Sequence, residues 1–152
     1  MAELVIRRME EKDIDGVTKV EKASFAVPWP RDIFQQEIVD NQFAHYFVVL
    51  VDQKIVGYAG LWVVADDAQI TNIAILPEYR GNRLGEKLFR YVMIQAFHIG
   101  GRRLSLEVRL SNLIAQHLYR KFGLVPGGIR KNYYTDNQED AMVMWVNLYE
   151  KR

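Results

Sequence analysis

The sequence of 152 residues contains no cysteine. This absence excludes disulfide bonds, thiolate metal ligands and an acyl-cysteine intermediate. The three histidines, His45, His98 and His117, lack the spacing of a metal site, and no Gly-x-Ser-x-Gly segment marks a serine nucleophile. We therefore expect chemistry that needs no metal and no cysteine nucleophile.

Long hydrophobic runs and an excess of one charge are also missing. No apolar run approaches the ~20 residues that a membrane helix needs, and Met1–Arg8 lacks the positive-then-apolar pattern of a signal peptide. Lys plus Arg number 20 and Asp plus Glu 19, so the net charge is +1, which gives no general attraction to nucleic acid or membrane. The sequence predicts a cytoplasmic protein with neither of these as a direct partner, and it leaves the oligomeric state open.

The composition is that of one globular domain. Hydrophobic residues make up 49% and charged residues 26%, as in soluble proteins with a core. The chain has no repeat or linker, so we expect a single domain over residues 1–152.

Apolar spacing and turn residues predict the order of helices and strands, and this order indicates an α/β fold (α+β type). We expect a mixed, mostly antiparallel sheet flanked by about four helices. The predicted elements are strand Leu4–Arg7, helices Asp13–Phe25 and Arg31–Val39, strands His45–Val51, Ile55–Val64 and Gln69–Ile75, helix Leu84–Ile99, strand Arg103–Leu110, helix Asn112–Phe122, and strands Leu124–Tyr133 and Ala141–Tyr149.

The segment Leu76–Glu86 joins a predicted strand to the clearest predicted helix. Glycines Gly81 and Gly85 allow the backbone to turn tightly and to approach a ligand closely. Free N–H groups at a helix start bind phosphate, and Arg80 and Arg83 add positive charge. The loop is therefore a candidate pyrophosphate site, although it is neither a Walker loop nor a dinucleotide glycine pattern. An ordinary strand–helix turn with solvated arginines explains the spacing equally well.

The predicted strand Arg103–Leu110 alternates strictly between apolar and polar residues. A strand inside a helix-covered sheet is usually apolar on both faces. The polar face therefore indicates either a water-filled cleft or an edge strand exposed to solvent. In a cleft, Glu107 would be able to take a proton from a nucleophile, directly or through water.

Two further candidates lie on the helix that follows. Asn112 begins this helix and Tyr119 lies seven residues later, two turns or ~10 Å along nearly the same face. Both could therefore touch one elongated ligand, with Tyr119 donating a proton to a leaving group. The alternative is that Asn112 only caps the helix and that Tyr119 is a partly buried tyrosine.

Aromatic residues in two loops are candidates for a substrate groove. Trp29 lies between two prolines, and Tyr133 and Tyr134 precede an acid-rich stretch at residues 136–140. Aromatic and acidic groups together would be able to bind a basic peptide. A plain hairpin loop and a core tryptophan are the alternatives.

Several of these segments resemble a known family. Residues 71–85, Thr-Asn-Ile-Ala-Ile-Leu-Pro-Glu-Tyr-Arg-Gly-Asn-Arg-Leu-Gly, resemble the acetyl-CoA signature of the GNAT N-acetyltransferases. Other segments resemble one branch, the ribosomal-protein-alanine N-acetyltransferases of the RimI type. The resemblance covers nearly the whole chain and is strongest from Thr71 to Met144. The segments that resemble this branch are Leu106–Asn112, Leu118–Gly123, Ile129–Tyr134, Glu139–Met142 and Pro28-Trp29.

The resemblance implies a single GNAT-like domain, acetyl-CoA as co-substrate, no metal, and roles for individual residues. Glu107 would be the general base and Tyr119 the general acid. The family pattern has a glycine where this chain has Arg83, so Gly81 would supply the flexibility of the loop instead. The residues that would hold acetyl-CoA are Ile73, Ala74 and Ile75 on the strand, Arg80, Gly81, Asn82, Arg83, Leu84, Gly85 and Glu86 around the pyrophosphate, and Asn112; those that would contact the acceptor are Trp29, Tyr133 and Tyr134.

The function that the resemblance implies is acetylation of a protein N-terminus, by direct transfer in a ternary complex. The partner would be the N-terminal segment of a ribosomal protein that begins with alanine. Three alternatives stay open: an acetyltransferase for lysine or a small amine, a non-catalytic acetyl-CoA sensor, and an RNA-binding accessory protein of the ribosome. The near-zero net charge disfavours the last of these.

Overall fold

The computed structural model describes residues 3–148 of the chain. Seven strands form one sheet, and four α-helices and two short 3-10 helices connect them. In chain order the elements are β1 (Leu4–Arg8), η1 (Glu11–Asp13), α1 (Ile14–Ser24), α2 (Arg31–Val39), β2 (Ala44–Val51), β3 (Lys54–Val64), β4 (Asp67–Ile75), η2 (Pro77–Tyr79), α3 (Leu84–Ile99), β5 (Arg103–Arg109), α4 (Leu113–Lys121), β6 (Val125–Arg130) and β7 (Ala141–Asn147).

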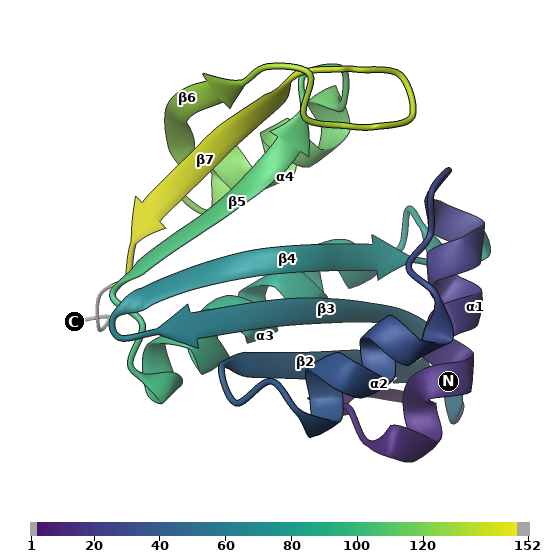
Figure 1. Cartoon of the computed structure of the whole chain (residues 1–152). Helices are drawn as coiled ribbons and strands as arrows, with labels where there is room; N and C mark the ends of the chain where they lie inside the picture. Colours follow the sequence, from purple (N-terminus) through teal and green to yellow (C-terminus); the bar gives the residue numbers. More distant parts are fainter. Residues whose placement is uncertain (1–2, 149–152) are drawn as a thin grey trace.

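The strands lie in the order β1-β2-β3-β4-β5-β7-β6. All neighbours are antiparallel except β4 and β5, which are parallel and are connected through α3. In the view of Figure 1, α1 and α2 lie in front of the sheet and α3 lies behind it. The sheet is therefore mixed and mostly antiparallel, as the sequence predicts.

Strands β4 and β5 stay together only at one end. Their pairing is limited to Asp67, Ala68 and Gln69 of β4 with residues 103–105 of β5. Beyond this point the two strands diverge, and the sheet opens as a V (Figure 1). The peptide groups of β4 that face β5 past Gln69 have no strand partner, as at the edge of a sheet.

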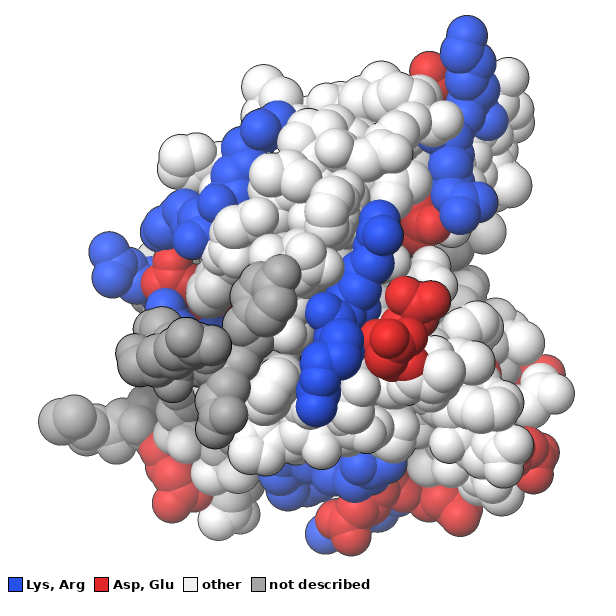
Figure 2. Space-filling model, turned by 90° about the vertical axis from the view of Figure 1, so that its left-hand side faces the viewer, with Lys and Arg blue, Asp and Glu red and all other residues white. Residues whose placement is uncertain are grey.

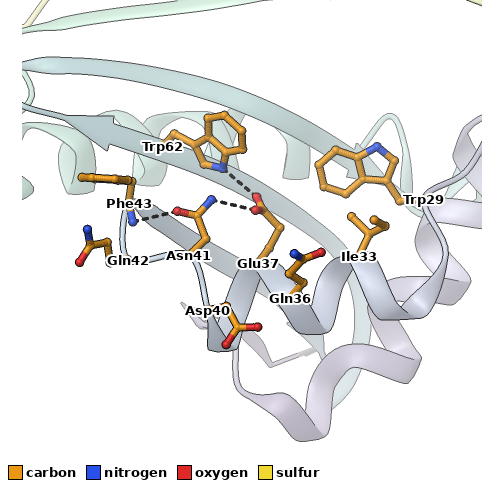
Figure 3. A pocket seen from close by; sticks show the side chains of 9 residues that line it. All are labelled: Trp29, Ile33, Gln36, Glu37, Asp40, Asn41, Gln42, Phe43 and Trp62. Atoms are coloured by element: carbon orange, nitrogen blue, oxygen red, sulfur yellow. Dashed lines mark hydrogen bonds between the residues drawn. The ribbon is translucent and has the colours of Figure 1, made fainter.

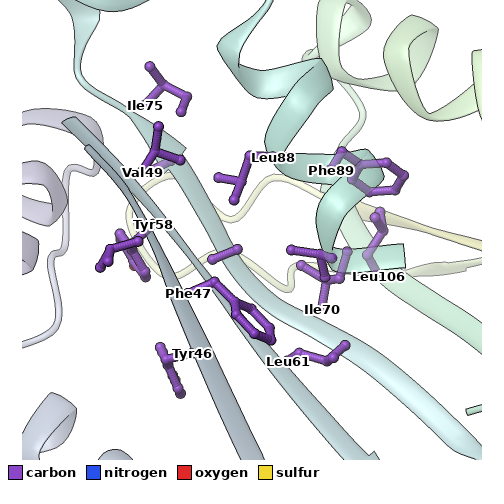
Figure 4. Packing of buried hydrophobic residues seen from close by; sticks show 14 of the residues in the cluster. Tyr46, Phe47, Val49, Tyr58, Leu61, Ile70, Ile75, Leu88, Phe89 and Leu106 are labelled. Carbon is purple, nitrogen blue, oxygen red and sulfur yellow. The ribbon is translucent and has the colours of Figure 1, made fainter. Parts of the chain in front are cut away.

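Helices cover both faces of the central strands, which explains why β2 and β3 are apolar over long runs. Phe47 and Tyr58 on these strands, and Leu88 and Phe89 on α3, are among the large side chains that are fully or almost fully buried (Figure 4). Burying an aliphatic or aromatic side chain stabilises a fold by about 1.5–3 kcal/mol. The core thus packs β4 against its neighbour β3 and against α3 on one face of the sheet. This packing holds one side of the opening in place.

On the face shown in Figure 2, basic and acidic side chains are interspersed with uncharged surface. None of the helices that the structure describes is both long and apolar enough to cross a bilayer. Within residues 3–148, His, Asp and Glu side chains form no group of three that would hold a metal ion.

The predicted order of elements is confirmed, with differences at their ends. Strand β6 ends at Arg130 instead of Tyr133, because Asn132 adopts a left-handed backbone conformation with φ of 53°. The backbone N–H of Asn132 donates instead to a carboxylate oxygen of Asp140, at 2.8 Å. Neither 3-10 helix was predicted. The predicted end of the last strand, Tyr149, lies outside the described residues.

Candidate active site

A cavity of about 860 Å³ lies where β4 and β5 diverge. Residues 70–73 of β4 and 106–109 of β5 line it from the sheet, and two loops, residues 25–30 and 133–136, complete it. Strand β5 lies between β4 and β7, so the interpretation of its polar face as a solvent-exposed edge is wrong. Of the residues singled out in the sequence, the cavity brings together Trp29, Ile73, Glu107, Asn112, Tyr119, Tyr133 and Tyr134.

Glu107 points from the middle of β5 into this cavity, and its side chain is only 11% exposed. One carboxylate oxygen accepts a hydrogen bond from Nε2 of Gln69 on β4, at 3.2 Å. The other lies 3.2 Å from Nε of Arg130 on β6. The carboxylate is therefore held from both sides of the opening, in a place where it can reach a ligand.

Tyr119 is a buried residue of α4 that also lines the cavity. Its ring packs against Phe89 of α3, with 5.0 Å between the ring centroids. Burial raises the pKa of Tyr119 to about 12, and Tyr134 adds to the increase. The phenol consequently keeps its proton throughout the physiological pH range, as a proton donor must. A pKa of about 12 also makes it a weaker acid than a free phenol, so proton transfer from Tyr119 requires a strongly basic acceptor.

Asn112 is the N-cap of α4, and its side-chain oxygen accepts the backbone N–H of Ala115 at 3.1 Å. The capping role considered from the sequence is therefore real. Asn112 also lines the cavity, so capping does not exclude contact with a ligand. The cap uses the side-chain oxygen, which fixes the orientation of the whole amide.

The loop before α3 presents backbone N–H groups in the way that the sequence predicts. The helix starts at Leu84, and the backbone N–H of Lys87 is bonded to the carbonyl of Arg83 at 3.0 Å. Helix geometry leaves the N–H groups of residues 84–86 without intrahelical acceptors. A Cβ added to Gly85 would meet no atom within 4 Å, so the fold itself does not require glycine there. These features fit a pyrophosphate that approaches the backbone closely.

Arg83 occupies a strained position in this loop. It has a φ of 59°, in the left-handed region, directly before α3, and Gly81 also has a positive φ of 88°. A glycine would adopt both conformations more easily than an arginine. The glycine of the family pattern thus meets a backbone requirement that Arg83 satisfies at some cost, while its guanidinium adds a positive charge.

Arg80 points away from the loop. Its Nε donates to the carbonyl of Ile75 at 2.9 Å, and Nη2 lies 3.5 Å from the hydroxyl of Ser24. This arginine fastens the end of β4 to α1. Glu86 is likewise engaged, in an ion pair with Lys121 of α4 at 2.7 Å. Of the two loop arginines, Arg83 is the one that directly precedes the helix.

Strand β4 carries an irregularity just before Ile73–Ile75, the residues that the resemblance assigns to acetyl-CoA, whose extended pantetheine arm would lie there. Gly60 of β3 pairs with Asn72, and the next residue of β3 pairs with Ile70, so Thr71 is an extra residue in the ladder. In the described part of the chain, the buried side-chain oxygens of Thr71 and Asn72 lack a hydrogen-bond partner. Together with the unpaired edge through Ile73–Ile75, this stretch has polar groups available to an extended ligand.

Glu21 is a site residue that the sequence analysis missed. Its carboxylate is 2% exposed, lines the cavity, and accepts the backbone N–H of Trp29 at 2.9 Å and the hydroxyl of Tyr58. Burial raises the pKa of Glu21, although both hydrogen bonds oppose the shift. A signal was present, since Glu21 lies seven residues after Ile14, on the same apolar stripe of α1.

The acid-rich stretch after Tyr134 is occupied by the protein itself, contrary to the expectation that it binds a basic peptide. The guanidinium of Arg109 donates to both carboxylate oxygens of Asp136 at 3.0 Å and to Glu139 at 3.3 Å. Its Cζ also lies 4.0 Å from the ring centroid of Tyr134. Glu139 in turn accepts the backbone N–H of Ser111 at 2.7 Å. Arg109 therefore fixes the loop between β6 and β7 over the cavity.

Comparison with known proteins agrees with this geometry. Residues 14–124 match the model of the acetyltransferase (GNAT) family. A protein of Bacillus subtilis (strain 168), provisionally named a [ribosomal protein bS18]-alanine N-acetyltransferase, is 57% identical over 145 residues, 95% of this chain and 96% of that protein. The [ribosomal protein bS18]-alanine N-acetyltransferase of Escherichia coli (strain K12) is 34% identical over 143 residues, 91% and 94% of the two chains.

Structural comparison points to the same kind of protein. The crystal structure of the ribosomal-protein-S18-alanine N-acetyltransferase from Escherichia coli superimposes with a TM-score of 0.89 at 30% identity, over 99% of this chain and 97% of that one. The family model covers residues 14–124, and both relatives and this structure extend over more than 90% of the chain. The chain therefore belongs to the GNAT acetyltransferase family, as an acetyl-CoA-dependent N-acetyltransferase.

Proposed function

We propose that this enzyme acetylates the α-amine of a protein N-terminus, and that its substrate is the N-terminal alanine of ribosomal protein bS18. The observation that carries the proposal is 57% identity, along 95% of the chain, to a relative named for that reaction. The partner is then the N-terminal segment of a protein and not a nucleic acid. We infer from such a substrate that the enzyme acts in the cytoplasm.

The cavity supports a chain end as the acceptor. Loops 25–30 and 133–136 both line it, and an entrance between two loops is reached more easily by the end of a chain than by a side chain on a folded surface. An α-amine has a pKa near ~8 and a lysine near ~10.4, so at neutral pH far more of the α-amine is the free nucleophile. One carboxylate, that of Glu107, is then sufficient to accept the proton that the amine loses during the attack.

Two side chains would handle protons on opposite sides of the transfer. Acetyl-CoA supplies the acetyl group, activated as a thioester. Glu107 accepts the proton of the attacking amine, directly or through water, and Tyr119 donates its proton toward the departing sulfur. An N–H of the unpaired β4 edge near Ile73 would stabilise negative charge on the acetyl oxygen.

The co-substrate would lie along β4 and end at α3. The edge through Ile73–Ile75 binds the extended arm by its backbone groups, and the N–H groups of residues 84–86 hold the pyrophosphate together with Arg83. Asn112 contacts the arm from the α4 side. The open space at Gly85 supports this placement, because the absence of a side chain there matters to a ligand and not to the fold.

The test compares two peptides under saturating acetyl-CoA, with release of coenzyme A and mass spectrometry as readouts. One peptide begins Ala-Arg-Tyr-Phe with a free N-terminus; the other is blocked at its N-terminus and carries an internal lysine. We expect acetylation of the first peptide at its α-amine. Faster acetylation of the blocked peptide would favour a lysine acetyltransferase, and no release of coenzyme A with either peptide or with full-length bS18 would favour an acetyl-CoA sensor.

A further inference from the structure

A second hollow lies along α2 (Figure 3). It has a volume of about 570 Å³ and lies between α2, the turn that follows this helix, and β3. Trp29 and Ile33 line both hollows, so a chain that leaves the active site past these two residues enters the second one. We call this hollow the α2 groove, lined by Trp29, Ile33, Gln36, Glu37, Asp40, Asn41, Gln42, Phe43 and Trp62.

The α2 groove carries negative charge that is not balanced by any arginine or lysine of residues 3–148. The carboxylate of Glu37 accepts hydrogen bonds from Nε1 of Trp62 at 2.7 Å, from the hydroxyl of Tyr46 at 2.9 Å and from Nδ2 of Asn41 at 2.8 Å. All three donors are neutral, so they orient the carboxylate without cancelling its charge. Asp40 follows one helical turn later, and within residues 3–148 neither acid forms an ion pair.

The acids around the active-site cavity differ in this respect. Glu107 pairs with Arg130, and Asp136 and Glu139 pair with Arg109. Glu21 also lines the cavity without an ion pair, but it is buried and accepts hydrogen bonds from the Trp29 N–H and the Tyr58 hydroxyl. Among the acids that line the two hollows, Glu37 and Asp40 are therefore the ones open to a cation of the substrate.

Aromatic side chains lie beside these acids. Trp62 is 36% exposed and Phe43 is 43% exposed, and both line the groove near Glu37 (Figure 3). An arginine or lysine has an apolar stem that packs on such rings and a cationic end that is attracted to both the ring faces and the carboxylates. The groove thus combines the two properties that suit a long cationic side chain.

We propose that the α2 groove binds an arginine or lysine side chain of the protein substrate, located a few residues after the amine that is acetylated. The inference rests on the proposed function in one respect, that the acceptor is the end of a peptide chain. Its own support is the wall shared by the two hollows, the unbalanced charge of Glu37 and Asp40, and the exposed rings. It makes the groove a determinant of which protein N-termini are acetylated.

The first experiment scans the position of the cation. Peptides that begin with the same free alanine carry arginine or its uncharged analogue citrulline at one position from the second to the sixth. We expect KM for the arginine peptide to be lower, by roughly threefold to tenfold, at one position, with kcat unchanged. Raising the salt concentration should reduce the difference, because screening weakens partly exposed charge pairs.

Variants assign this preference to the groove. Asp40→Lys reverses an exposed charge, and Glu37→Gln keeps the size and the acceptor oxygen that Trp62 and Tyr46 use. Asp32→Asn, on the same helix but outside the groove, is the matched control. We expect Asp40→Lys to abolish or invert the arginine preference and Glu37→Gln to reduce it. Asp32→Asn should leave both the preference and the kinetics on the citrulline peptides unchanged.

Two outcomes would overturn the proposal. One is that arginine and citrulline peptides behave alike at every position. The other is that Asp40→Lys, with its thermal stability preserved, retains the preference in full. The proposed function is tested separately by whether the citrulline peptides are acetylated at their α-amine at all. If they are not, calorimetric binding of the same peptides to wild type and Asp40→Lys still tests the groove.

Discussion

Nε of Arg130 lies 3.2 Å from a carboxylate oxygen of Glu107, while Gln69 donates to the other oxygen. Both oxygens of the proposed base are therefore engaged before an amine arrives. The Arg130 side chain is 59% exposed, so it can move away at little cost when an amine takes its place. The pair orients Glu107 in the free enzyme and leaves its carboxylate accessible to the substrate.

Replacing Glu107 by glutamine should lower kcat/KM for the acceptor peptide by roughly 10²–10⁴-fold, because a positioned base typically contributes that much. The glutamine keeps the shape of the side chain and the contact with Gln69. Arg130→Gln is the control, and we expect it to change kcat/KM by less than about tenfold, since partly exposed ion pairs are weak. Near-wild-type rates for Glu107→Gln would refute its role as the base.

Tyr119→Phe should lower kcat while acetyl-CoA affinity stays nearly unchanged, because the phenylalanine ring retains the packing against Phe89. The raised pKa of about 12 means that Tyr119 itself introduces no fall in kcat below about pH 10.

The raised pKa of Tyr119 also makes stability depend on pH. The folded chain binds this proton more tightly than the unfolded chain, so this stabilisation is present below pH ~10 and is lost as the pH rises toward 12. Thermal denaturation of both proteins from pH 8 to 11 checks it.

Glu21 should make the stability of the fold depend on pH in the acidic range. Its pKa is raised by burial, so the folded chain binds the proton more tightly than the unfolded chain, and this stabilisation fades as the pH rises above the ordinary glutamate value of ~4.3. Glu21→Gln is neutral at every pH, so we expect it to be at least as stable as wild type at pH 7. The difference in the free energy of unfolding between the two proteins should become smaller toward pH 4.

Glu21→Ala distinguishes the contribution of the two hydrogen bonds to stability from that of the charge. It removes the acceptor of the Trp29 N–H and of the Tyr58 hydroxyl, so we expect lower stability and a higher KM for the acceptor, without a change in acetyl-CoA affinity. If Glu21→Gln loses stability to the same extent at every pH between 4 and 8, proton binding at Glu21 has no part in the effect.

Gly85→Ala should separate folding from cofactor binding. Alanine at a helix position is more favourable than glycine by roughly 0.5–1 kcal/mol, and the added methyl group meets no protein atom. The melting temperature should therefore stay the same or rise, while the Kd for coenzyme A rises by tenfold or more, because the methyl group occupies the space of the pyrophosphate. An unchanged Kd in calorimetry would mean that the phosphates bind elsewhere; Lys87→Ala, on the exposed side of the helix, serves as control.

Arg109→Lys tests the loop between β6 and β7. Lysine keeps the charge but cannot form the forked contact with Asp136 or stack equally well on Tyr134. We expect KM for the acceptor peptide to rise by roughly tenfold, with the Kd for coenzyme A unchanged. Equal effects on both ligands would indicate general loss of structure instead of a displaced loop.

The sequence was sufficient for features that depend on local patterns. The apolar stripe of Leu84–Ile99 identifies α3, and the alternation of Arg103–Arg109 identifies β5 and places Glu107 opposite its apolar face. The glycines between Leu76 and Glu86 mark the loop before α3. In each of these cases the residues that carry the signal are neighbours in the chain, so periodicity and turn chemistry suffice.

Features that depend on contacts between distant residues were missed. Arg80 looked like a loop cation, yet its guanidinium lies 3.5 Å from the hydroxyl of Ser24, 56 residues earlier in the chain. The acids after Tyr134 looked available, yet Arg109, 27 residues before Asp136, occupies them. A charged side chain reaches across the fold to whichever partner the topology brings near, and neither propensity nor spacing encodes that partner.

The closed end of the V has a consequence for the other end. Gly101 lies beside the three residue pairs that join β4 to β5, where an added Cβ would come within 2.9 Å of the Ala96 carbonyl and 3.1 Å of the Ala68 methyl group. Strands β4 and β5 are paired at this end and diverge from it. An increase of a few tenths of an ångström in the distance between the two strands here would therefore become a larger increase at Ile73 and Glu107. We therefore expect a larger residue at Gly101 to alter the distance between Ile73 and Glu107, although this glycine lies at the far end of the opening from the reacting groups.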